Sequence, residues 1–374
     1  MKKLAELMTP NFLIDLDKME RNIQDMGALC ESNGKKLCPM VKTHKSSELA
    51  KLQVQYGATS FLVGTVAEAE QLVKSGHKEI VFAYPIAAEE NIMRVIELAQ
   101  KSHVTLSFDG VDAAGQFEEQ LIKKHIVLDY LIIIDCGLHR FGVLPENIVE
   151  LAQQLKQLGH LNFKGIATHP GQVYGASNRA EVEAVEKAEI HALEEAKRRL
   201  NREKIEVEIV ATGSTPTVAA IAKNQTITTV RPGNYIFYDA IQVALHVVPW
   251  QRCSLTVLTT VISQPSKDVF MVDAGTKCFG LDKGAHSVAL LSGYGIVKDH
   301  PELIVESLSE EVGKIRAIGS TNLKVGQKIE VIPNHACSSA NMTSFFIGHR
   351  KGLVERMIAV DARRNAFRET SLIL

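Results

Sequence analysis

The feature that most constrains the fold is a regular alternation of short apolar runs with longer amphipathic segments. The apolar runs occupy residues 12–17, 37–41, 60–64, 79–85, 103–109, 128–135, 163–169, 206–214 and 228–237. Segments of helical period lie between them, for example residues 67–75 and the charged stretch 178–202. Strands that alternate with helices pair in parallel through right-handed crossovers. Roughly eight or nine such units in about 235 residues favour a closed (β/α)8 barrel of the TIM type, with an open doubly wound sheet as the alternative.

The pattern changes after about residue 246. Strand-like runs at 253–263, 269–274, 287–294, 303–307, 328–332 and 354–360 are separated by Gly, Pro, Asp and Lys, with little helical period between them. This predicts an antiparallel β domain of about 130 residues. A chain of 374 residues is long enough for two domains. We therefore expect a barrel over residues 10–245 and a β domain over residues 246–374, completed by residues 1–9.

Composition excludes several classes of protein. Lys and Arg number 42 against 43 Asp and Glu, so the net charge of −1 gives no basis for binding nucleic acid or an anionic membrane. No apolar run is long enough to cross a bilayer, and the N-terminal residues lack the apolar core of a signal peptide. The six cysteines have no short repeated spacing, so neither a zinc ribbon nor a disulfide framework is indicated. We expect a cytoplasmic protein.

Reactive side chains follow several of the expected strands. In a barrel of this type the chemistry lies at the carboxyl ends of the strands. The residues at these ends are Lys42 and His44, then Asp135, Cys136, His139 and Arg140, then Thr168, His169 and Tyr174, and finally Ser214 and Thr215. A purely structural barrel would carry its charges on the outer helices instead, so this concentration indicates a functional site.

Two glycine-containing turns are suited to a phosphate group. Residues 213–216, Gly-Ser-Thr-Pro, supply a flexible backbone, hydroxyl donors and a proline suited to a helix start, although such a turn is often an ordinary helix N-cap. Residues 231–234, Arg-Pro-Gly-Asn, offer a second glycine for close backbone approach. No nucleotide-binding glycine motif is present. A lysine at one strand end and a phosphate cradle across the rim predict pyridoxal phosphate, held as a Schiff base on Lys42.

The chain resembles a known family in its motifs. The pattern T-P-x-x-x-I-D-L-D is found at residues 9–17 and V-K-T-H-K at residues 41–45. The similarity continues through the strand ends at 135–140 and 168–169 and through both glycine turns. On these motifs the chain resembles the fold-type III pyridoxal-phosphate enzymes, in particular the D-serine dehydratase and D-threonine aldolase family, whose barrel is related to that of alanine racemase. The resemblance covers nearly the whole chain.

The resemblance implies roles for individual residues. Lys42 would carry the cofactor and act as the catalytic base. The remaining cofactor-binding residues would be Ser214, Thr215, Gly233 and Asn234 at the phosphate, Arg140 and His169 near the ring, and Tyr174 hydrogen-bonded or stacked beside them. Asp273 matches a family position near the active site, contributed by a partner subunit, and a homodimer is implied. Many relatives have Arg and His where this chain has Cys38 and Met40, so contacts made there are expected to differ.

A metal site is indicated near the C-terminus, in the sequence Pro-Asn-His-Ala-Cys that ends at Cys337. His335 and Cys337 are two apart, so on an extended segment they point to the same face. Imidazole and thiolate suit Zn²⁺, with manganese as the alternative, and two protein ligands leave positions open for water and substrate. The competing interpretation is a buried cysteine near a satisfied histidine. The resemblance favours the metal, with His335 catalytic. Dehydratases of the family resemble this H-x-C pattern, whereas aldolases more often have H-x-D.

The expected function is that of a pyridoxal-phosphate- and metal-dependent lyase acting on a small D-β-hydroxy amino acid. D-serine dehydratase, which forms pyruvate and ammonia, is the first expectation, and an aldolase for D-threonine or 3-hydroxyaspartate is the alternative. An amino-acid racemase would need a base on the opposite face and no metal. A non-catalytic carrier of pyridoxal phosphate would resemble a bare barrel, so the expected β domain disfavours it.

Overall fold

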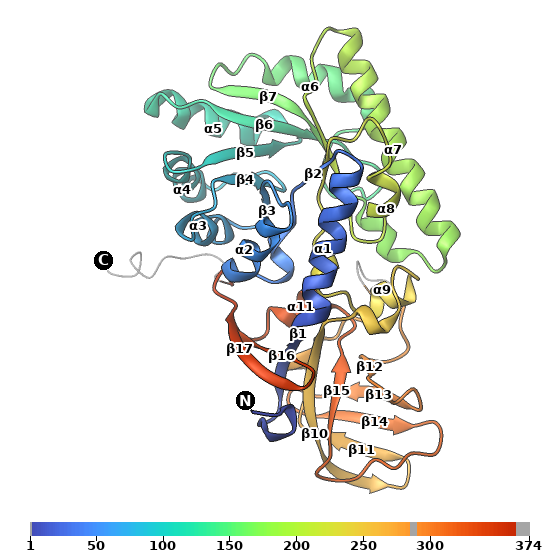
Figure 1. The fold of residues 1–374 in the computed structure, drawn as a ribbon. Helices are drawn as coiled ribbons and strands as arrows, with labels where there is room; N and C mark the ends of the chain where they lie inside the picture. The colour runs from blue at the N-terminus through green and yellow to red at the C-terminus, as the bar shows by residue number, and fades with distance from the viewer. Residues whose placement is uncertain (1, 285–289, 364–374) are drawn as a thin grey trace. The chain divides into compact units, whose positions relative to one another are not determined.

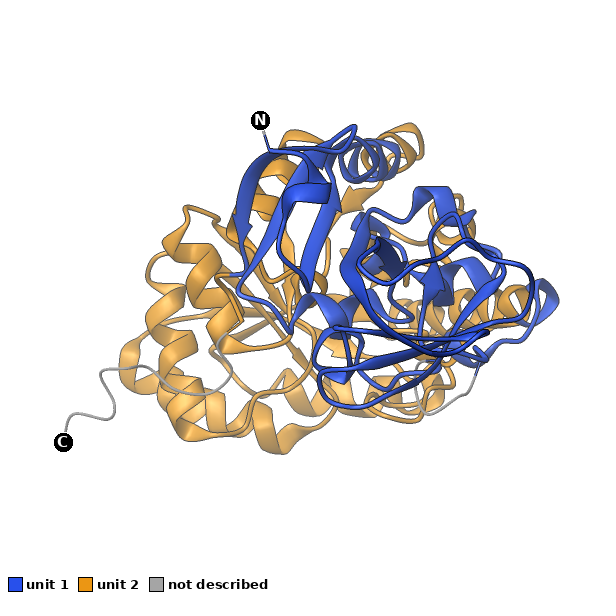
Figure 2. Ribbon diagram, turned by 90° about the horizontal axis from the view of Figure 1, so that it is seen from below, with its two compact units in different colours: residues 1–26, 174–181, 234–360 blue, residues 27–173, 182–233, 361–374 orange. Residues whose placement is uncertain are grey.

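The computed structural model describes residues 2–284 and 290–363. The chain divides into two compact units, coloured separately in Figure 2. Unit 1 consists of Met1–Met26, Tyr174–Glu181 and Asn234–Val360, and unit 2 of Gly27–Val173, Val182–Gly233 and Asp361–Leu374. The borders of these units differ from the expected domain borders at 10–245 and 246–374, which stay a prediction. Residues 364–374 lie outside the described part.

A closed parallel sheet forms the inner layer of unit 2 (Figure 1). Its strands are β2 (Lys36–Leu37), β3 (Phe61–Val63), β4 (Glu79–Phe82), β5 (His103–Phe108), β6 (Leu128–Ile133), β7 (Leu161–Ala167), β8 (Ile209–Thr212) and β9 (Thr229–Val230). The order is β2-β9-β8-β7-β6-β5-β4-β3, and parallel bridges from Leu37 to Ala58 and from Met40 to Leu62 connect the two ends. The expected (β/α)8 barrel is confirmed, and the open sheet is not formed.

A helix follows each strand from β2 to β8. These helices are α2 (Ser47–Gln55), α3 (Val66–Lys74), α4 (Glu89–Ala99), α5 (Val111–Lys124), α6 (Ile148–Leu155), α7 (Arg179–Arg202) and α8 (Val218–Ile221). The helical segments expected at 67–75 and 178–202 correspond to α3 and α7. Helix α3 begins with a capping box, in which the Thr65 hydroxyl accepts from the Glu68 N–H and the Glu68 carboxylate accepts from the Thr65 N–H. Local sequence therefore defines where this helix starts.

Apolar side chains from the strands fill the barrel. Leu131, Ala167 and Ala211, from β6, β7 and β8, form one buried cluster. Cys38 and Met40 pack with β3 in another, against partly buried side chains of β4 and the residue after it. Each Leu or Met side chain of these clusters that is removed from water stabilises the fold by about 1.5–3 kcal/mol. This packing fixes the strand ends from which the candidate residues project.

Unit 1 is built on a nine-stranded sheet of order β11-β14-β13-β12-β15-β10-β1-β16-β17. The strands are β1 (Asn11–Asp15), β10 (Leu255–Ser266), β11 (Val269–Val272), β12 (Ile296–Val297), β13 (Leu303–Leu308), β14 (Gly313–Ala317), β15 (Lys328–Ile332), β16 (Phe345–Arg350) and β17 (Leu353–Ala359). A further pairing of β11 with β10 closes the part from β11 to β10 into an antiparallel barrel. The expected antiparallel β domain is confirmed. The run expected at 287–294 is not a strand in its described part, residues 290–294, and its first three residues lie outside the described part. Short helices α9 (Ala240–Ala244), α10 (Thr276–Phe279) and α11 (Ala336–Ala340) also belong to this unit.

The run at residues 12–17 is not a barrel strand. It forms β1, which pairs antiparallel with β10 and parallel with β16 in the sheet of unit 1. Helix α1 (Leu16–Ser32) then follows it directly. An apolar run buried on both faces has the same pattern in either sheet, so periodicity assigned it to the wrong one.

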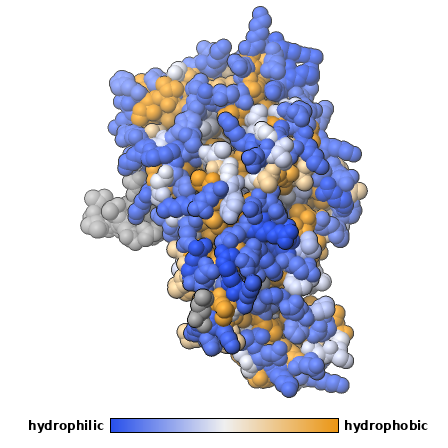
Figure 3. All heavy atoms as spheres, in the orientation of Figure 1, coloured by the Kyte–Doolittle hydropathy of each residue, from blue (hydrophilic) through white to orange (hydrophobic). Residues whose placement is uncertain are grey.

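The described helices include none that is both long and apolar enough to cross a membrane. On the face of the molecule drawn in Figure 3, hydrophilic residues predominate and hydrophobic residues are scattered among them. Scattered exposed apolar residues are normal on a protein surface.

Candidate functional site

Unit 2 brings its candidate residues to the carboxyl ends of five neighbouring strands. The adjacent strands β2, β9, β8, β7 and β6 are followed by Lys42, by Gly233, by Ser214 and Thr215, by His169, and by Arg140, respectively. The adjacency of β2 and β9 results from closure of the barrel, because these strands are far apart in the sequence. The structure therefore collects these residues along one arc of the rim, where barrel enzymes place their chemistry.

Lys42 lies in a short 3-10 helix, Val41–Thr43, and its side chain is exposed between two buried neighbours. The expected strand 37–41 is shorter than predicted, but the chain continues alongside β9. The Met40 N–H donates to the Pro232 carbonyl at 2.9 Å. A lysine with an exposed side chain on a fixed backbone is suited to reaction with an aldehyde.

The two glycine turns lie beside this lysine. Gly213 has φ +117°, in the left-handed region that favours glycine. A Cβ added to Gly233 would lie 3.0 Å from Thr43 Oγ1 and 3.1 Å from Met40 Cβ, so the second turn packs closely against the lysine segment. Ser214 is buried after Gly213. The helix after the first turn, α8, has only four residues, so the turn itself carries any phosphate contact.

Two buried charged residues of unit 2 were missed by sequence reasoning. The Arg231 Nη2 donates to the Thr168 carbonyl, whereas its Nε and Nη1 are buried without a hydrogen-bond partner. Glu189 of α7 accepts from the Thr212 hydroxyl at 2.5 Å and is fully buried. Burial raises the pKa of Glu189 to about 7, against the opposing effects of Thr212, neighbouring donors and the Arg231 charge. Strand and helix patterns do not show which charged residues face inward, so no local signal identified this pair.

Arg140, His169 and Arg231 line one pocket of unit 2. The guanidinium of Arg140 is exposed and lies 5.3 Å from the ring centroid of Phe141, within range of a cation–π contact. Asp135 closes the same turn by accepting from the N–H groups of two residues that follow it. The pocket is thus polar, with two guanidinium groups available to an anionic or electron-rich ligand.

Cys38 and Met40, the positions expected to differ from the relatives, are buried in the apolar cluster with Leu62. Burial raises the pKa of the Cys38 thiol to about 11, although Ser60 and the charge of Arg231 act in the opposite direction. Both side chains therefore have the packing of barrel core residues.

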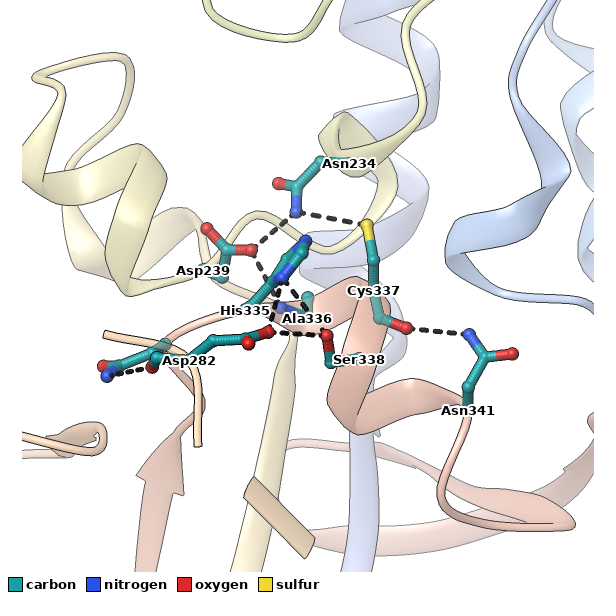
Figure 4. A network of polar contacts seen from close by, with 9 residues as sticks. Asn234, Asp239, Asp282, His335, Ala336, Cys337, Ser338 and Asn341 are labelled. Carbon is teal, nitrogen blue, oxygen red and sulfur yellow. Dashed lines mark hydrogen bonds and ion pairs between the residues drawn. The ribbon is translucent and has the colours of Figure 1, made fainter. Parts of the chain in front are cut away.

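The second group of candidates lies in unit 1, around the start of α11 (Figure 4). His335 is the N-cap residue of α11, and Cys337 is in its first turn. The two side chains are hydrogen-bonded to each other. The expectation of an extended segment was wrong at this point, because the turn of the helix, and not strand alternation, brings the imidazole and thiol together.

Acidic groups surround this pair. The Asp282 carboxylate is 2.8 Å from His335 Nδ1 and accepts from the Ser338 hydroxyl at 2.7 Å. The buried Asp239 accepts from the Ala336 N–H at 2.8 Å. Burial alone would lower the pKa of His335, but Asp282, Cys337 and Asp239 outweigh it and raise that pKa to about 11. A site that stabilises a positive imidazole in this way also favours a bound cation.

Tyr174 and Asn234, expected at the cofactor, belong to unit 1 in this structure. The Asn234 amide nitrogen donates to Asp239 at 2.6 Å and lies 3.8 Å from Cys337 Sγ. Burial and the nearby charges of Cys337 and Asp239 raise the pKa of Tyr174, so its hydroxyl stays protonated. Asp273 accepts from the hydroxyls of Thr9 and Thr259, at 2.5 and 2.7 Å, and so joins the N-terminal segment to β10.

The residues of unit 2 fit pyridoxal phosphate. An aldehyde-bearing aromatic phosphate requires an exposed lysine, a glycine turn with buried hydroxyls, and buried N–H groups such as those of Arg231. Acceptors for those N–H groups are absent among the described protein atoms, and such groups are costly to leave unpaired.

The donor set in unit 1 fits a divalent metal. Because the Asp282 carboxylate is hydrogen-bonded to Nδ1 of His335, Nε2 is the ring nitrogen that can bind a metal. This is the usual arrangement of a metal-binding histidine. Within residues 2–284 and 290–363 no group of three or more His, Cys, Asp or Glu is placed to hold a metal ion. The residues that would hold a metal here are His335 and Cys337, and this pair would leave positions open for other groups.

Comparison with known proteins identifies the family. The family model described as alanine racemase, N-terminal domain, matches residues 14–240, and that of a putative serine dehydratase domain matches residues 254–348. A D-threo-3-hydroxyaspartate dehydratase from Delftia sp. (strain HT23) is 30% identical over 353 residues, covering 90% of this chain and 92% of the relative. A D-serine dehydratase from Dictyostelium discoideum is 27% identical, covering 91% and 93%.

Solved structures agree with this result. The structure of the Delftia dehydratase has a TM-score of 0.90 and 28% identity, covering 98% of this chain and 100% of that one. An alanine racemase from Clostridium difficile has a TM-score of 0.69 at 14% identity, which shows the shared fold alone. The chain therefore belongs to the fold-type III pyridoxal-phosphate enzymes in which an alanine racemase N-terminal domain is combined with a serine dehydratase domain.

Proposed function

We propose that this chain, a pyridoxal-phosphate-dependent lyase, removes water from a small D-β-hydroxy amino acid with the help of a divalent metal. D-serine, converted to pyruvate and ammonia, is the first candidate substrate. The observation that carries the proposal is the pair His335 and Cys337 with Asp282 behind the imidazole. A cation site of this kind is needed to activate a substrate hydroxyl, and a racemase or a carrier has no use for it.

Different residues of the chain would bind the cofactor and move the proton. The amine of Lys42 would hold the cofactor and, once released, take the proton from the substrate Cα. Ser214, Thr215, Gly233 and Asn234 would bind the phosphate, and Arg140, His169, Arg231 and Tyr174 would orient the ring. When bound, pyridoxal phosphate supplies an electron sink for the negative charge at Cα. Tyr174 would act as a hydrogen-bond donor because its pKa is raised.

His335 and Cys337 would hold the metal. Zinc is the first candidate because thiolate and imidazole are softer ligands than manganese prefers. A divalent ion supplies Lewis acidity at the substrate β-hydroxyl, which favours its departure as water. Asp282 would keep Nε2 of His335 directed to the ion by accepting from Nδ1.

Aldol cleavage is the second candidate. A 3-hydroxy-D-aspartate aldolase from Paracoccus denitrificans (strain Pd 1222) is 28% identical over 373 residues, and a D-threonine aldolase from Arthrobacter is 26% identical over 367. If a base removes the hydroxyl proton instead of the hydroxyl leaving, the Cα–Cβ bond breaks and an aldehyde forms. The same lysine and metal ligands would serve both reactions, so the products decide between them.

One experiment tests this proposal. Purified protein is incubated with D-serine, L-serine, D-threonine and D-threo-3-hydroxyaspartate, with zinc or with EDTA, and keto acid and aldehyde are assayed separately. Keto acid from the D-isomers, lost with EDTA and restored by zinc, is the expected result. Keto acid from L-serine alone would overturn the stereochemistry, and full activity in EDTA would overturn the metal role.

The role of Lys42 has its own test. Lys42→Ala should abolish the visible absorbance of the bound cofactor, whereas Lys51→Ala, which removes an exposed lysine on α2, should retain it. A variant Lys42→Ala with an unchanged spectrum would contradict the assignment.

We also propose a cytoplasmic homodimer. The six cysteines all lie within the described residues, where none of them forms a disulfide, and five are buried, as is usual in a reducing compartment. The homodimer rests on the family resemblance, and light scattering of the purified protein would test it.

A further inference from the structure

The segment after β17 returns to the lysine-bearing part of unit 2. Asp361 accepts from the N–H of Ser47 at 2.8 Å, a residue 314 positions earlier in the chain. Its other carboxylate oxygen accepts from the Ser47 hydroxyl and, at 2.9 Å, from the Gln71 amide. The next residue, Ala362, donates its N–H to the Lys45 carbonyl at 2.9 Å. Three contacts thus join two adjacent residues to the segment that begins at Lys42, and a fourth reaches Gln71 on α3.

The contacted segment has an unfavourable backbone conformation. Lys45 has φ +45°, a left-handed value that is uncommon for a residue with a side chain. Its ammonium group is nearly buried and forms an ion pair of 3.2 Å with Glu68. A conformation of this kind persists only where the surroundings hold it. The N–H of Ala362 on the Lys45 carbonyl is one of the contacts that do so.

His44 connects this conformation to the lysine. Its Nδ1 accepts from the Ser46 N–H at 3.1 Å, and its Nε2 lies 3.2 Å from the Gln53 amide oxygen. Burial lowers the pKa of His44 to about 4, so the ring is neutral near pH 7 and donates from Nε2. The N–H groups of His44 and Lys45 both donate to the Val41 carbonyl, at 3.1 and 2.9 Å. Hydrogen bonds therefore link residues 41–46 into one turn, which ends directly before Ser47.

Helix α2 begins at the end of this turn, at the residue that Asp361 contacts. A carboxylate at a helix N-terminus satisfies N–H groups that have no partner within the helix and interacts favourably with the helix dipole. Asp361 thus fixes the far end of the turn at Ser47, while Ala362 fixes its middle at Lys45.

We propose that Asp361 is a positioning residue for Lys42, because the contacts of Asp361 and Ala362 hold residues 41–47 in the conformation that presents the lysine amine. This inference rests on the proposed role of Lys42 as the cofactor-binding lysine. Asp361 would act without contacting the cofactor or the substrate. Its effect passes through the backbone of the turn.

The first measurement uses cofactor-free protein and hydrogen–deuterium exchange over residues 41–55. Asp361→Ala should speed exchange at Ser47 and its neighbours by about tenfold, because a buried N–H loses a charged acceptor. Asp361→Asn keeps a neutral acceptor, so its exchange rate should lie between those of Asp361→Ala and the wild type. Asp112→Ala, an exposed carboxylate on α5 of the same unit, is the matched control and should match the wild type.

The second measurement is the binding of pyridoxal phosphate, followed by its visible absorbance. Asp361→Ala should raise the dissociation constant about tenfold, with Asp361→Asn restoring most of the affinity. Ser47→Ala, which removes one donor and keeps the backbone contact, should have a smaller effect and provides a variant that folds if Asp361→Ala does not.

The outcomes separate the two proposals. Faster exchange together with weaker cofactor binding supports the positioning role. A lower Tm in Asp361→Ala with unchanged exchange at 41–47 and unchanged cofactor affinity would mean a purely structural residue and overturn it. A wild-type protein that binds no cofactor would overturn the proposed function and the positioning role together, even if the exchange difference were present.

Discussion

Replacement of Asp282 by alanine should weaken zinc binding at His335 and Cys337 by about 10- to 30-fold. The carboxylate accepts from His335 Nδ1 at 2.8 Å and from the Ser338 hydroxyl at 2.7 Å. Without it, Nδ1 retains the Ser338 hydroxyl at 3.2 Å, a neutral and longer contact. The imidazole then loses both its fixed orientation and the negative charge that favours a cation beside it.

The magnitude follows from the geometry and exposure of the pair. A hydrogen bond to a charged group contributes about 1.5–3 kcal/mol, which corresponds to a factor of roughly 10 to 150 in affinity. The side chains of His335 and Asp282 are 26% and 39% exposed, so solvent screens part of the interaction. The lower part of that range therefore applies. Asp282→Asn, which keeps a neutral acceptor, should bind zinc about threefold to tenfold more weakly than the wild type.

The assay is a zinc titration of cofactor-free protein against a competing chromophoric chelator at constant pH. Asp268→Ala is the matched control, because this exposed carboxylate of unit 1 is paired with Arg316 at 3.0 Å and should leave zinc affinity unchanged. His335→Ala should abolish specific binding. If Asp282→Ala binds zinc as tightly as the wild type while His335→Ala does not, the carboxylate has no orienting role and the reasoning fails.

Three further predictions concern other parts of the site. Folding raises the pKa of Glu189 from 4.5 to about 7, so the stability of the wild type relative to Glu189→Gln should fall as pH rises between these values, by about 3 kcal/mol in all. Denaturant unfolding from pH 4 to 8 measures this difference in stability, and a difference that does not change with pH would contradict the prediction. Gly213→Ala forces a side chain into φ +117° and should weaken pyridoxal phosphate binding about tenfold. Gly115→Ala on α5, where a Cβ meets nothing within 4 Å, is the control and should leave binding unchanged. Equal affinities of the two variants in absorbance titrations would contradict the role of the Gly213 turn in cofactor binding. Cys337→Asp, which creates the H-x-D pattern, should raise the ratio of aldehyde to keto acid formed from D-threonine, and an unchanged ratio would show that this ligand does not select the reaction.

The alternation of strands and helices and the strand-end motifs were readable from sequence. Each barrel strand from β3 to β8 coincides with an expected apolar run, because a strand buried on both faces is continuously apolar. Lys42 and the turn at Gly213 were found because each follows such a run directly. The lysine segment needed only local information to be recognised.

Errors and omissions arose where distant segments meet. The run at residues 12–17 was assigned to the barrel, and its partners β10 and β16 lie more than 200 residues away. Asp282 was missed because it comes from a loop 53 residues before His335. No spacing rule relates a carboxylate to an imidazole over such a separation.

The sequence alone determined the fold class, the cofactor-binding lysine as a prediction, and the imidazole and thiol of the predicted metal site. These features depend on contiguous residues, whose periodicity and order are fixed by the chain. Only the tertiary structure decided that β2 lies beside β9, that Arg231 and Glu189 face inward, and that Asp361 reaches the lysine turn. Those relations depend on how the sheet closes and on where the chain returns to it. Local patterns do not specify them, because the segments that meet are far apart in the sequence and many pairs of segments have the same pattern.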